Sequence, residues 1–160
     1  EVIAQKQKND EAAAAAERER LKSKQVTSRG GMTSRHSDYK GGAPLSSYVY
    51  ISSYYGMRNG KMHTGVDFAA NAGTPIYAWK SGIVTYKGWN GSYGNFVEIQ
   101  HNDSTVSRYA HMSGYNCSEG QTVSKGQTIG YVGTTGNSTG NHLHFEIKVN
   151  GSFVNPLNYL

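Results

Sequence analysis

The segment from His142 to Val149 constrains the fold more than any other part of this sequence. It reads His-Leu-His-Phe-Glu-Ile-Lys-Val, so apolar residues occupy every second position and polar residues lie between them. This period of two is that of a β-strand with one face against a hydrophobic core. Because Leu143 and Phe145 occupy the core face, we expect His142 and His144 together on the opposite face. The alternation therefore predicts a strand that carries two imidazoles away from the core.

Three further residues complete a set that is typical of a hydrolytic metal site. His63 and Asp67 are four positions apart, and His111 lies between them and the two C-terminal histidines. Gly65 and its neighbours favour an extended segment, in which His63 and Asp67 share a face. Two imidazoles and one carboxylate can hold a zinc ion and leave its fourth position open to water. The set predicts one zinc ion per chain and hydrolytic chemistry.

The histidines are more numerous than a three-ligand zinc site needs. His142 and His144 are separated by about 7 Å along their strand, so one can bind the metal while the other faces the substrate or the bound water. In the segment 105–111, alternation places Tyr109 and His111 on one face. An imidazole near the water can accept its proton, and another can donate a hydrogen bond to a developing oxyanion. Hydrolysis of a peptide or amide would use every member of the set.

The chain from residue 44 onwards predicts a mainly β protein. Strands are expected at residues 48–51, 65–69, 75–78, 82–87, 95–101, 105–111, 128–132 and 143–149. Turn signals such as Asn90-Gly91 and Asn150-Gly151 separate them. These features predict an antiparallel β-sheet domain with an open substrate groove. The run of Gly, Thr, Ser and Asn from Gly133 to Asn141 is expected to form one wall of that groove.

Four stretches of this domain carry specific motifs. They are His63-Thr-Gly-Val-Asp67, Tyr109-Ala-His111-Met112, the segment 123–130 and the segment 133–144. Together they closely resemble the lysostaphin-type zinc endopeptidases, which cut bacterial peptidoglycan. The resemblance covers residues 44–160 and implies that this part is a zinc endopeptidase domain. It also implies that His63, Asp67 and His144 bind zinc, while His111 and His142 act on the water and the transition state.

The resemblance also implies a substrate and a location. The substrate would be the peptide cross-links or stem peptides of peptidoglycan. The location would be extracytoplasmic, in the cell wall, secreted or tethered to a membrane, in a protein of bacterial or phage origin. The net charge is +5 at pH 7. Because no basic stripe with interleaved aromatic residues accompanies this charge, nucleic acid is not an expected partner.

The N-terminal part differs in composition from the β domain. Residues 1–29 are rich in Ala, Glu, Lys, Arg and Gln and contain neither Gly nor Pro, which predicts a single N-terminal helix, the end of a longer helical region. This helix is a candidate for binding a protein partner or for self-association. Residues 30–43, with two Gly-Gly pairs, predict a flexible linker, and we hypothesise that it folds back over the groove with His36 near the metal. An export signal or a membrane anchor is expected upstream of Glu1.

Two other classes of function compete with the enzyme. A non-catalytic relative of the same fold could bind peptidoglycan, or act as a scaffold or activator of another wall enzyme. The presence of all five candidate site residues favours the enzyme over this alternative. A carrier or sugar-transport domain is suggested by the segment 125–130, which resembles a swinging-arm hairpin, but that alternative leaves His63 and Asp67 unexplained. Arg58 is a candidate to pair with a substrate carboxylate.

Overall fold

The structure is a computed structural model that describes residues 41–160. Its strands are β1 (Tyr50–Ser53), β2 (Gly56–Arg58), β3 (Lys61–His63), β4 (Val66–Ala69), β5 (Pro75–Tyr77), β6 (Gly82–Trp89), β7 (Asn95–Gln100), β8 (Thr105–Tyr115), β9 (Thr122–Val123), β10 (Thr128–Val132), β11 (His142–Val149) and β12 (Ser152–Val154). Two short 3-10 helices complete this part, η2 (Gly91–Tyr93) and η3 (Pro156–Tyr159). The predicted mainly β, antiparallel architecture is confirmed. The predicted N-terminal helix lies outside the described residues.

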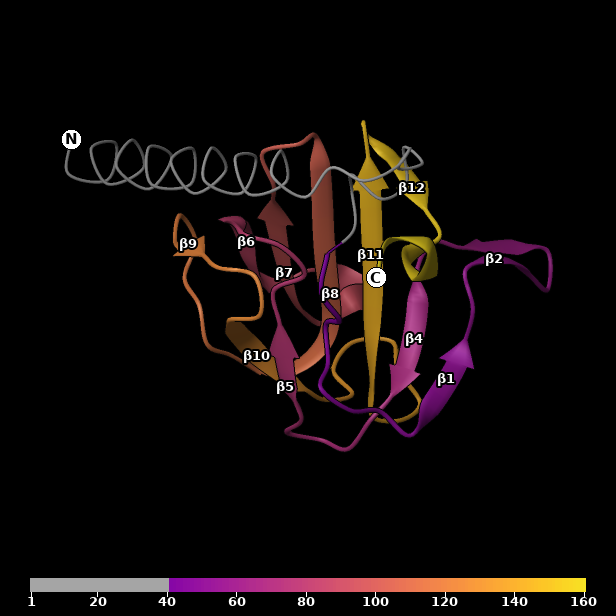
Figure 1. The fold of residues 1–160 in the computed structure, drawn as a ribbon. Coiled ribbons are helices and arrows are strands. Elements are labelled where there is room, and N and C mark those ends of the chain that lie inside the picture. Colours follow the sequence, from indigo (N-terminus) through magenta and orange to yellow (C-terminus); the bar gives the residue numbers. More distant parts are fainter. Residues whose placement is uncertain (1–40) are drawn as a thin grey trace.

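Strand β11 lies inside the main sheet, between β4 and β8 (Figure 1). The order along this sheet is β1-β4-β11-β8-β7-β6-β9, and each pair of neighbours is antiparallel. In addition, β10 pairs with both β5 and β8, and β12 pairs with β11. The three strands β4, β11 and β8 therefore bring residues that are far apart in the sequence onto one small area.

The hydrophobic core lies against the apolar face of β11. Leu143, Phe145 and Ile147 are fully buried, as the alternation predicted. Tyr109 of β8 packs against Phe145, with ring centroids 5.3 Å apart. Each such side chain stabilises the fold by about 1.5–3 kcal/mol relative to an exposed position. The opposite face of β11 is also covered, because Glu146 is 0% exposed and so cannot be a solvated surface residue.

A bulge in β8 changes which residues share a face. Tyr109 pairs with Phe145 and Ala110 pairs with His144, so strict alternation would place His111 in the core beside Tyr109. Instead the pairing of β7 with β8 slips by one residue here, and His111 has a φ of 58°. A bulge of this kind turns the side chain that follows it. The prediction that Tyr109 and His111 share a face is therefore wrong, and the ring of His111 lies 6.0 Å from that of His144.

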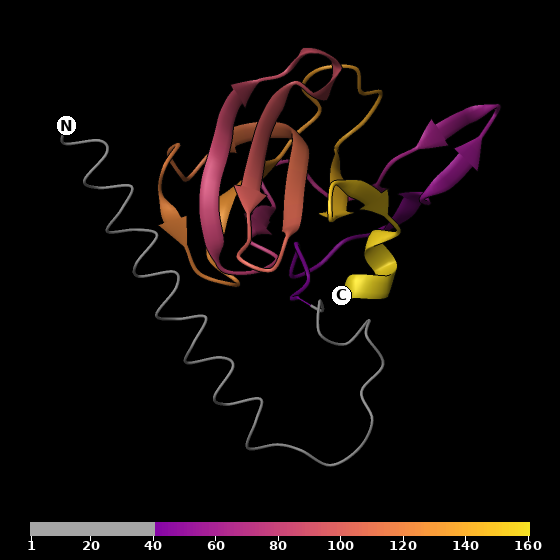
Figure 2. The same cartoon turned by 90° about the horizontal axis from the view of Figure 1, so that it is seen from above.

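Strands β2 and β3 form a separate hairpin that projects from the body of the domain (Figure 2). Met57 and Met62 pair across it, and both are exposed. An exposed hairpin has no buried face to impose alternation, which explains why the sequence did not predict it. His63 is the last residue of β3, whereas Asp67 belongs to β4. The single extended segment expected for these two residues is therefore divided between two strands.

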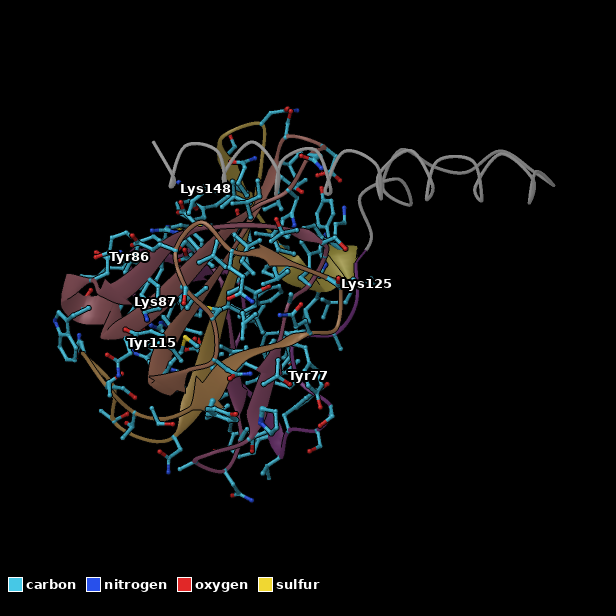
Figure 3. All side chains as sticks on the ribbon, turned by 90° about the vertical axis from the view of Figure 1, so that its left-hand side faces the viewer. Tyr77, Tyr86, Lys87, Tyr115, Lys125 and Lys148 are labelled. Atoms are coloured by element: carbon cyan, nitrogen blue, oxygen red, sulfur yellow. The ribbon has the colours of Figure 1, made fainter. Side chains whose placement is uncertain are left out.

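The side of the domain formed by β6, β9 and β10 carries several lysines (Figure 3). Lys87 lies between Tyr86 and Tyr115, and its Nζ is 5.1 Å from the centre of the Tyr115 ring. Lys125 and Lys148 lie well apart from Lys87 in the same view. The labelled lysines thus do not form one continuous stripe.

Within residues 41–160, no helix is long and apolar enough to span a bilayer.

His101 is buried in a hydrogen-bond network at the end of β7. Its Nδ1 lies 2.8 Å from the carbonyl oxygen of Ser81, and its Nε2 lies 2.9 Å from Oγ of Ser107. Because a carbonyl only accepts, Nδ1 carries the proton and Nε2 accepts from the Ser107 hydroxyl. Burial lowers the pKa of His101 to about 4. This residue therefore stabilises the fold in its neutral form.

We predict that protonation of His101 destabilises the protein in acid. The neutral ring is favoured in the folded state, so its contribution is present above the unfolded pKa of about 6.5 and is lost as pH falls toward the folded value. Between about pH 6.5 and pH 4 this loss reaches up to about 3 kcal/mol. Urea unfolding across this range should show a steeper decline for the wild type than for His101→Gln. Equal slopes in the two proteins would contradict the assignment.

Candidate metal centre

Three buried polar side chains converge where β3, β4 and β11 meet. His63 ends β3, Asp67 lies in β4, and His144 lies in β11 directly opposite Asp67. One nitrogen or oxygen atom from each lies within 4.8 Å of the other two. Two imidazoles and one carboxylate at these separations fit a divalent metal ion that accepts nitrogen and oxygen ligands. The structure thus brings together the three residues predicted as metal ligands.

The hydrogen bonds of His63 leave one of its nitrogens available. Its Nδ1 lies 2.8 Å from the carbonyl oxygen of Tyr54, so Nδ1 carries the proton and donates it. Its Nε2 then keeps a free lone pair and lies 3.3 Å from Oδ1 of Asp67. The same Oδ1 lies 2.7 Å from Nδ1 of His144. Oδ1 of Asp67 is therefore the point at which the two imidazoles meet.

These contacts shift the pKa values of the cluster. Burial opposes ionisation of Asp67, but hydrogen bonds from His144 and His63 outweigh it and hold the pKa of the carboxyl well below its usual range. Burial likewise opposes protonation of His144, but hydrogen bonds to Asp67 and Glu146 raise its pKa to about 9. The carboxylate of Asp67 is thus ionised at neutral pH and attracts a positive charge to this position.

A second carboxylate lies behind His144, and the sequence did not predict a role for it. Oε1 of Glu146 is 2.8 Å from Nε2 of His144. Glu146 also accepts hydrogen bonds from Thr64, Tyr93 and Arg108, at 2.6, 2.9 and 2.8 Å. The alternation placed Glu146 on the histidine face of its strand, which was the only available signal. Its partners come from distant parts of the chain, so pattern reasoning could not find them.

His111 and His142 lie side by side next to the cluster, with ring centroids 4.7 Å apart. Nδ1 of His111 lies 2.7 Å from the carbonyl oxygen of Thr135, and Nδ1 of His142 lies 2.8 Å from that of Gly140. Both carbonyls belong to the segment 133–141. Because carbonyls accept, each ring carries its proton on Nδ1 and leaves Nε2 free. Burial lowers the pKa of His111, which favours its neutral form.

All five predicted site residues line one open pocket of about 420 Å³. Its wall consists of Arg58, Met62, His63, Thr64, Asp67, Ser92, Tyr93, His111, Asn137, Ser138, Thr139, His142, His144 and Glu146. The expected wall from the segment 133–141 is present through three of these residues. Arg58 also faces the pocket, where its Nη1 donates to Oγ of Ser53 at 2.6 Å. His36 lies outside the described residues.

The segment 133–141 is held against the turn between β6 and β7. Oγ1 of Thr135 accepts from the backbone N–H of Asn95 at 3.1 Å and donates to the carbonyl oxygen of Met112 at 2.7 Å. Gly94 has a φ of 65°, and a Cβ at this position would collide with the backbone of Thr135 and Gly136. The two chain segments can approach this closely only because Gly94 has no side chain. This packing positions the carbonyl that holds His111.

Gly94→Ala should therefore cost more stability than a glycine replacement in open space. We expect a loss of more than about 2 kcal/mol in the free energy of unfolding, from backbone strain together with the clash. Gly91→Ala is the matched control, since Gly91 also has a positive φ, 53°, but no atom would lie within 4 Å of its Cβ. The control should lose about 1 kcal/mol. Urea unfolding of both variants tests this, and equal losses would refute the close packing.

An antiparallel sheet that brings two histidines and an aspartate to the floor of an open pocket is the arrangement of a metallopeptidase domain. The chain belongs to Peptidase family M23, which its residues 61–156 match. The resemblance to the lysostaphin-type enzymes that the motifs indicated is thereby confirmed.

Individual relatives agree with this family. The chain is 45% identical over 126 residues to "DD-carboxypeptidase/endopeptidase Mpg" of Neisseria meningitidis, covering 74% of this chain and 29% of that protein. It is 46% identical over 99 residues to lysostaphin of Staphylococcus simulans, covering 61% of this chain and 20% of that protein. The solved structure of Helicobacter pylori Csd3 superposes with a TM-score of 0.69 at 37% identity, covering 76% of this chain and 35% of that chain. This chain thus spans less than a third of the length of the two curated relatives.

Proposed function

We propose that residues 44–160 form a zinc-dependent endopeptidase domain that hydrolyses peptide cross-links or stem peptides of bacterial peptidoglycan. The observation that carries this proposal is the convergence of His63, Asp67 and His144 in a pocket that also holds His111 and His142. The names of the relatives, a DD-carboxypeptidase/endopeptidase and lysostaphin, support the reaction class. Backbone hydrogen bonds from Gly41 to Tyr159 and from Gly42 to Trp79 already attach the chain to the domain a few residues before position 44.

The donor set supports zinc as the metal, with one ion per chain. His63 would bind through Nε2, Asp67 through Oδ1 and His144 through Nδ1, because these are the atoms that face one another. Three protein ligands leave one position for water or substrate, which is the arrangement of catalytic zinc sites. When bound, zinc supplies an activated water and polarises the carbonyl of the scissile bond.

His111 and His142 are proposed as the catalytic residues. Each has its Nδ1 proton donated to a backbone carbonyl, so the free Nε2 can accept a proton and, once protonated, can donate a hydrogen bond. A neutral imidazole with a lowered pKa, such as His111, can act as a general base at neutral pH. The two rings would share proton transfer and stabilisation of the oxyanion that forms on the peptide carbonyl.

The remaining assignments concern the setting of the domain. A peptidoglycan substrate places it outside the cytoplasm, in the cell wall, secreted or tethered to a membrane. Residues 1–29 are proposed as an arm for a protein partner or for self-association, joined to the domain by the linker 30–43. Residues 1–40 lie outside the described residues, so these proposals rest on the composition of the sequence.

Two substitutions should separate metal binding from catalysis. Asp67→Ala removes a proposed ligand, so we expect loss of both zinc and activity. His111→Ala removes a proposed base, so we expect one zinc per chain and a loss of activity of about 10²-fold or more. Zinc is measured by elemental analysis, and activity is measured as new amino groups released from purified peptidoglycan.

Lys61→Gln is the control, because Lys61 lies beside His63 on the same hairpin but does not line the pocket. It should retain both zinc and activity. Equal loss of zinc in Asp67→Ala and His111→Ala would contradict the proposed division of roles. Zinc binding by the wild type without any release of amino groups would instead favour a non-catalytic peptidoglycan-binding or scaffold protein.

A further inference from the structure

Glu146 is the most deeply buried carboxylate beside the proposed zinc site. Its side chain is 0% exposed, and burying a charge costs free energy unless partners compensate it. Arg108 supplies the compensating charge, with Nη1 2.8 Å from Oε2 of Glu146. The other oxygen, Oε1, points to the imidazole of His144. Glu146 therefore links a half-buried cation on one side to a proposed zinc ligand on the other.

The hydrogen bonds of Glu146 determine what it can do. Oε1 lies within hydrogen-bond distance of Thr64 Oγ1, Tyr93 OH and His144 Nε2, and Oε2 accepts from Arg108. Each carboxylate oxygen offers about two lone-pair sites, so the three donors around Oε1 occupy its capacity, while the guanidinium of Arg108 lies against Oε2. Oε1, the oxygen that faces His144, then has no lone pair left for a metal ion. The acid is suited to orient a ligand rather than to act as one.

The same contacts join the segments that carry the ligands. Thr64 directly follows His63, and its hydroxyl donates to Glu146 on β11, two residues after His144. Gly65 permits this approach, because a Cβ there would collide with the carbonyl oxygen of Phe145. One carboxylate thus fixes the ring of His144 and ties the β3–β4 corner to β11. A fixed ring and a fixed corner set the separation of the two imidazoles.

We propose that Glu146 is a positioning residue of the metal centre, which holds the Nε2 proton of His144 so that Nδ1 is presented to the metal. The proposal rests on the zinc site proposed above. A histidine ligand whose second nitrogen donates to a carboxylate has a fixed orientation and a more basic ligand atom. Loss of such a partner weakens metal affinity by about 10- to 100-fold.

The test is a zinc titration of the whole chain against a chromogenic chelator. Glu146→Gln keeps the size of the side chain but removes its charge and half of its acceptors, and we expect zinc affinity about 10- to 100-fold below the wild type. Glu98→Gln is the matched control. Oε2 of Glu98 lies 3.2 Å from Nε of Arg108, but within residues 41–160 Glu98 forms no hydrogen bond or ion pair with His144. It should bind zinc like the wild type.

Three further measurements separate the positioning role of Glu146 from a general effect on folding. Long-range ¹H–¹⁵N spectra of the zinc-loaded wild type should show His144 protonated on Nε2 only, and this signature should weaken in Glu146→Gln. If Glu146→Gln does not fold, Thr64→Val removes one hydrogen bond to the carboxylate and should weaken zinc binding about fivefold, the equivalent of about 1 kcal/mol. Thermal unfolding of the metal-free proteins confirms that each variant is folded.

The outcomes are distinct. Wild-type zinc affinity in both Glu146→Gln and Thr64→Val, or equal losses in Glu146→Gln and Glu98→Gln, would overturn the positioning role. A wild type that binds no zinc would overturn the metal site and this inference with it. Zinc binding that depends on Glu146 in a protein that releases no amino groups would support the inference and count against the proposed peptidase function.

Discussion

The register between β4 and β11 is the constraint on which the site depends. Asp67 pairs directly with His144 across these strands, which places Oδ1 of the carboxylate 2.7 Å from Nδ1 of the imidazole. Side chains alternate along a strand, so a slip of β11 by one residue would turn His144 to the opposite face, away from Asp67. The apolar residues of β11 oppose such a slip, since it would bring Leu143 and Phe145 out of the core. The packing of the core and the geometry of the proposed metal site are therefore fixed by the same strand pairing.

His111 and His142 are held by irregular structure, and hydrogen bonds and close packing fix that structure in turn. His111 reaches the pocket only because of the bulge in β8, and its ring is fixed by the carbonyl of Thr135. Thr135 is in turn held by Asn95 and Met112, and it packs against Gly94. Each imidazole proposed for catalysis thus depends on a backbone carbonyl of the segment 133–141. The strands position the proposed metal ligands, whereas carbonyls of this segment fix the tautomers of His111 and His142.

The sequence predicted the regular parts of this arrangement well. The eight expected strands correspond to β1, β4, β5, β6, β7, β8, β10 and β11, because buried strands impose a period of two on the residues that form them. All five candidate site residues line one pocket. They could be predicted because their residue types, spacing and motifs are specific enough to be recognised in a sequence. The face of His111 was predicted wrongly, since a single inserted residue in β8 reverses the alternation. The hairpin β2–β3 was missed because its exposed residues carry no pattern of burial.

A role for Glu146 could not be predicted from the sequence. The energetics of its ion pair with Arg108 indicate why a charged residue is buried at this position. A buried ion pair is weak evidence for stability, because the cost of desolvating two charges can exceed their attraction. The pair of Glu146 with Arg108 thus need not stabilise the fold more than two apolar side chains of similar volume would. An apolar replacement would, however, leave Nε2 of His144 without its acceptor. A requirement to orient this imidazole accounts for a fully buried carboxylate at the strand position two residues after the proposed ligand, where hydrophobic packing alone would favour an apolar side chain.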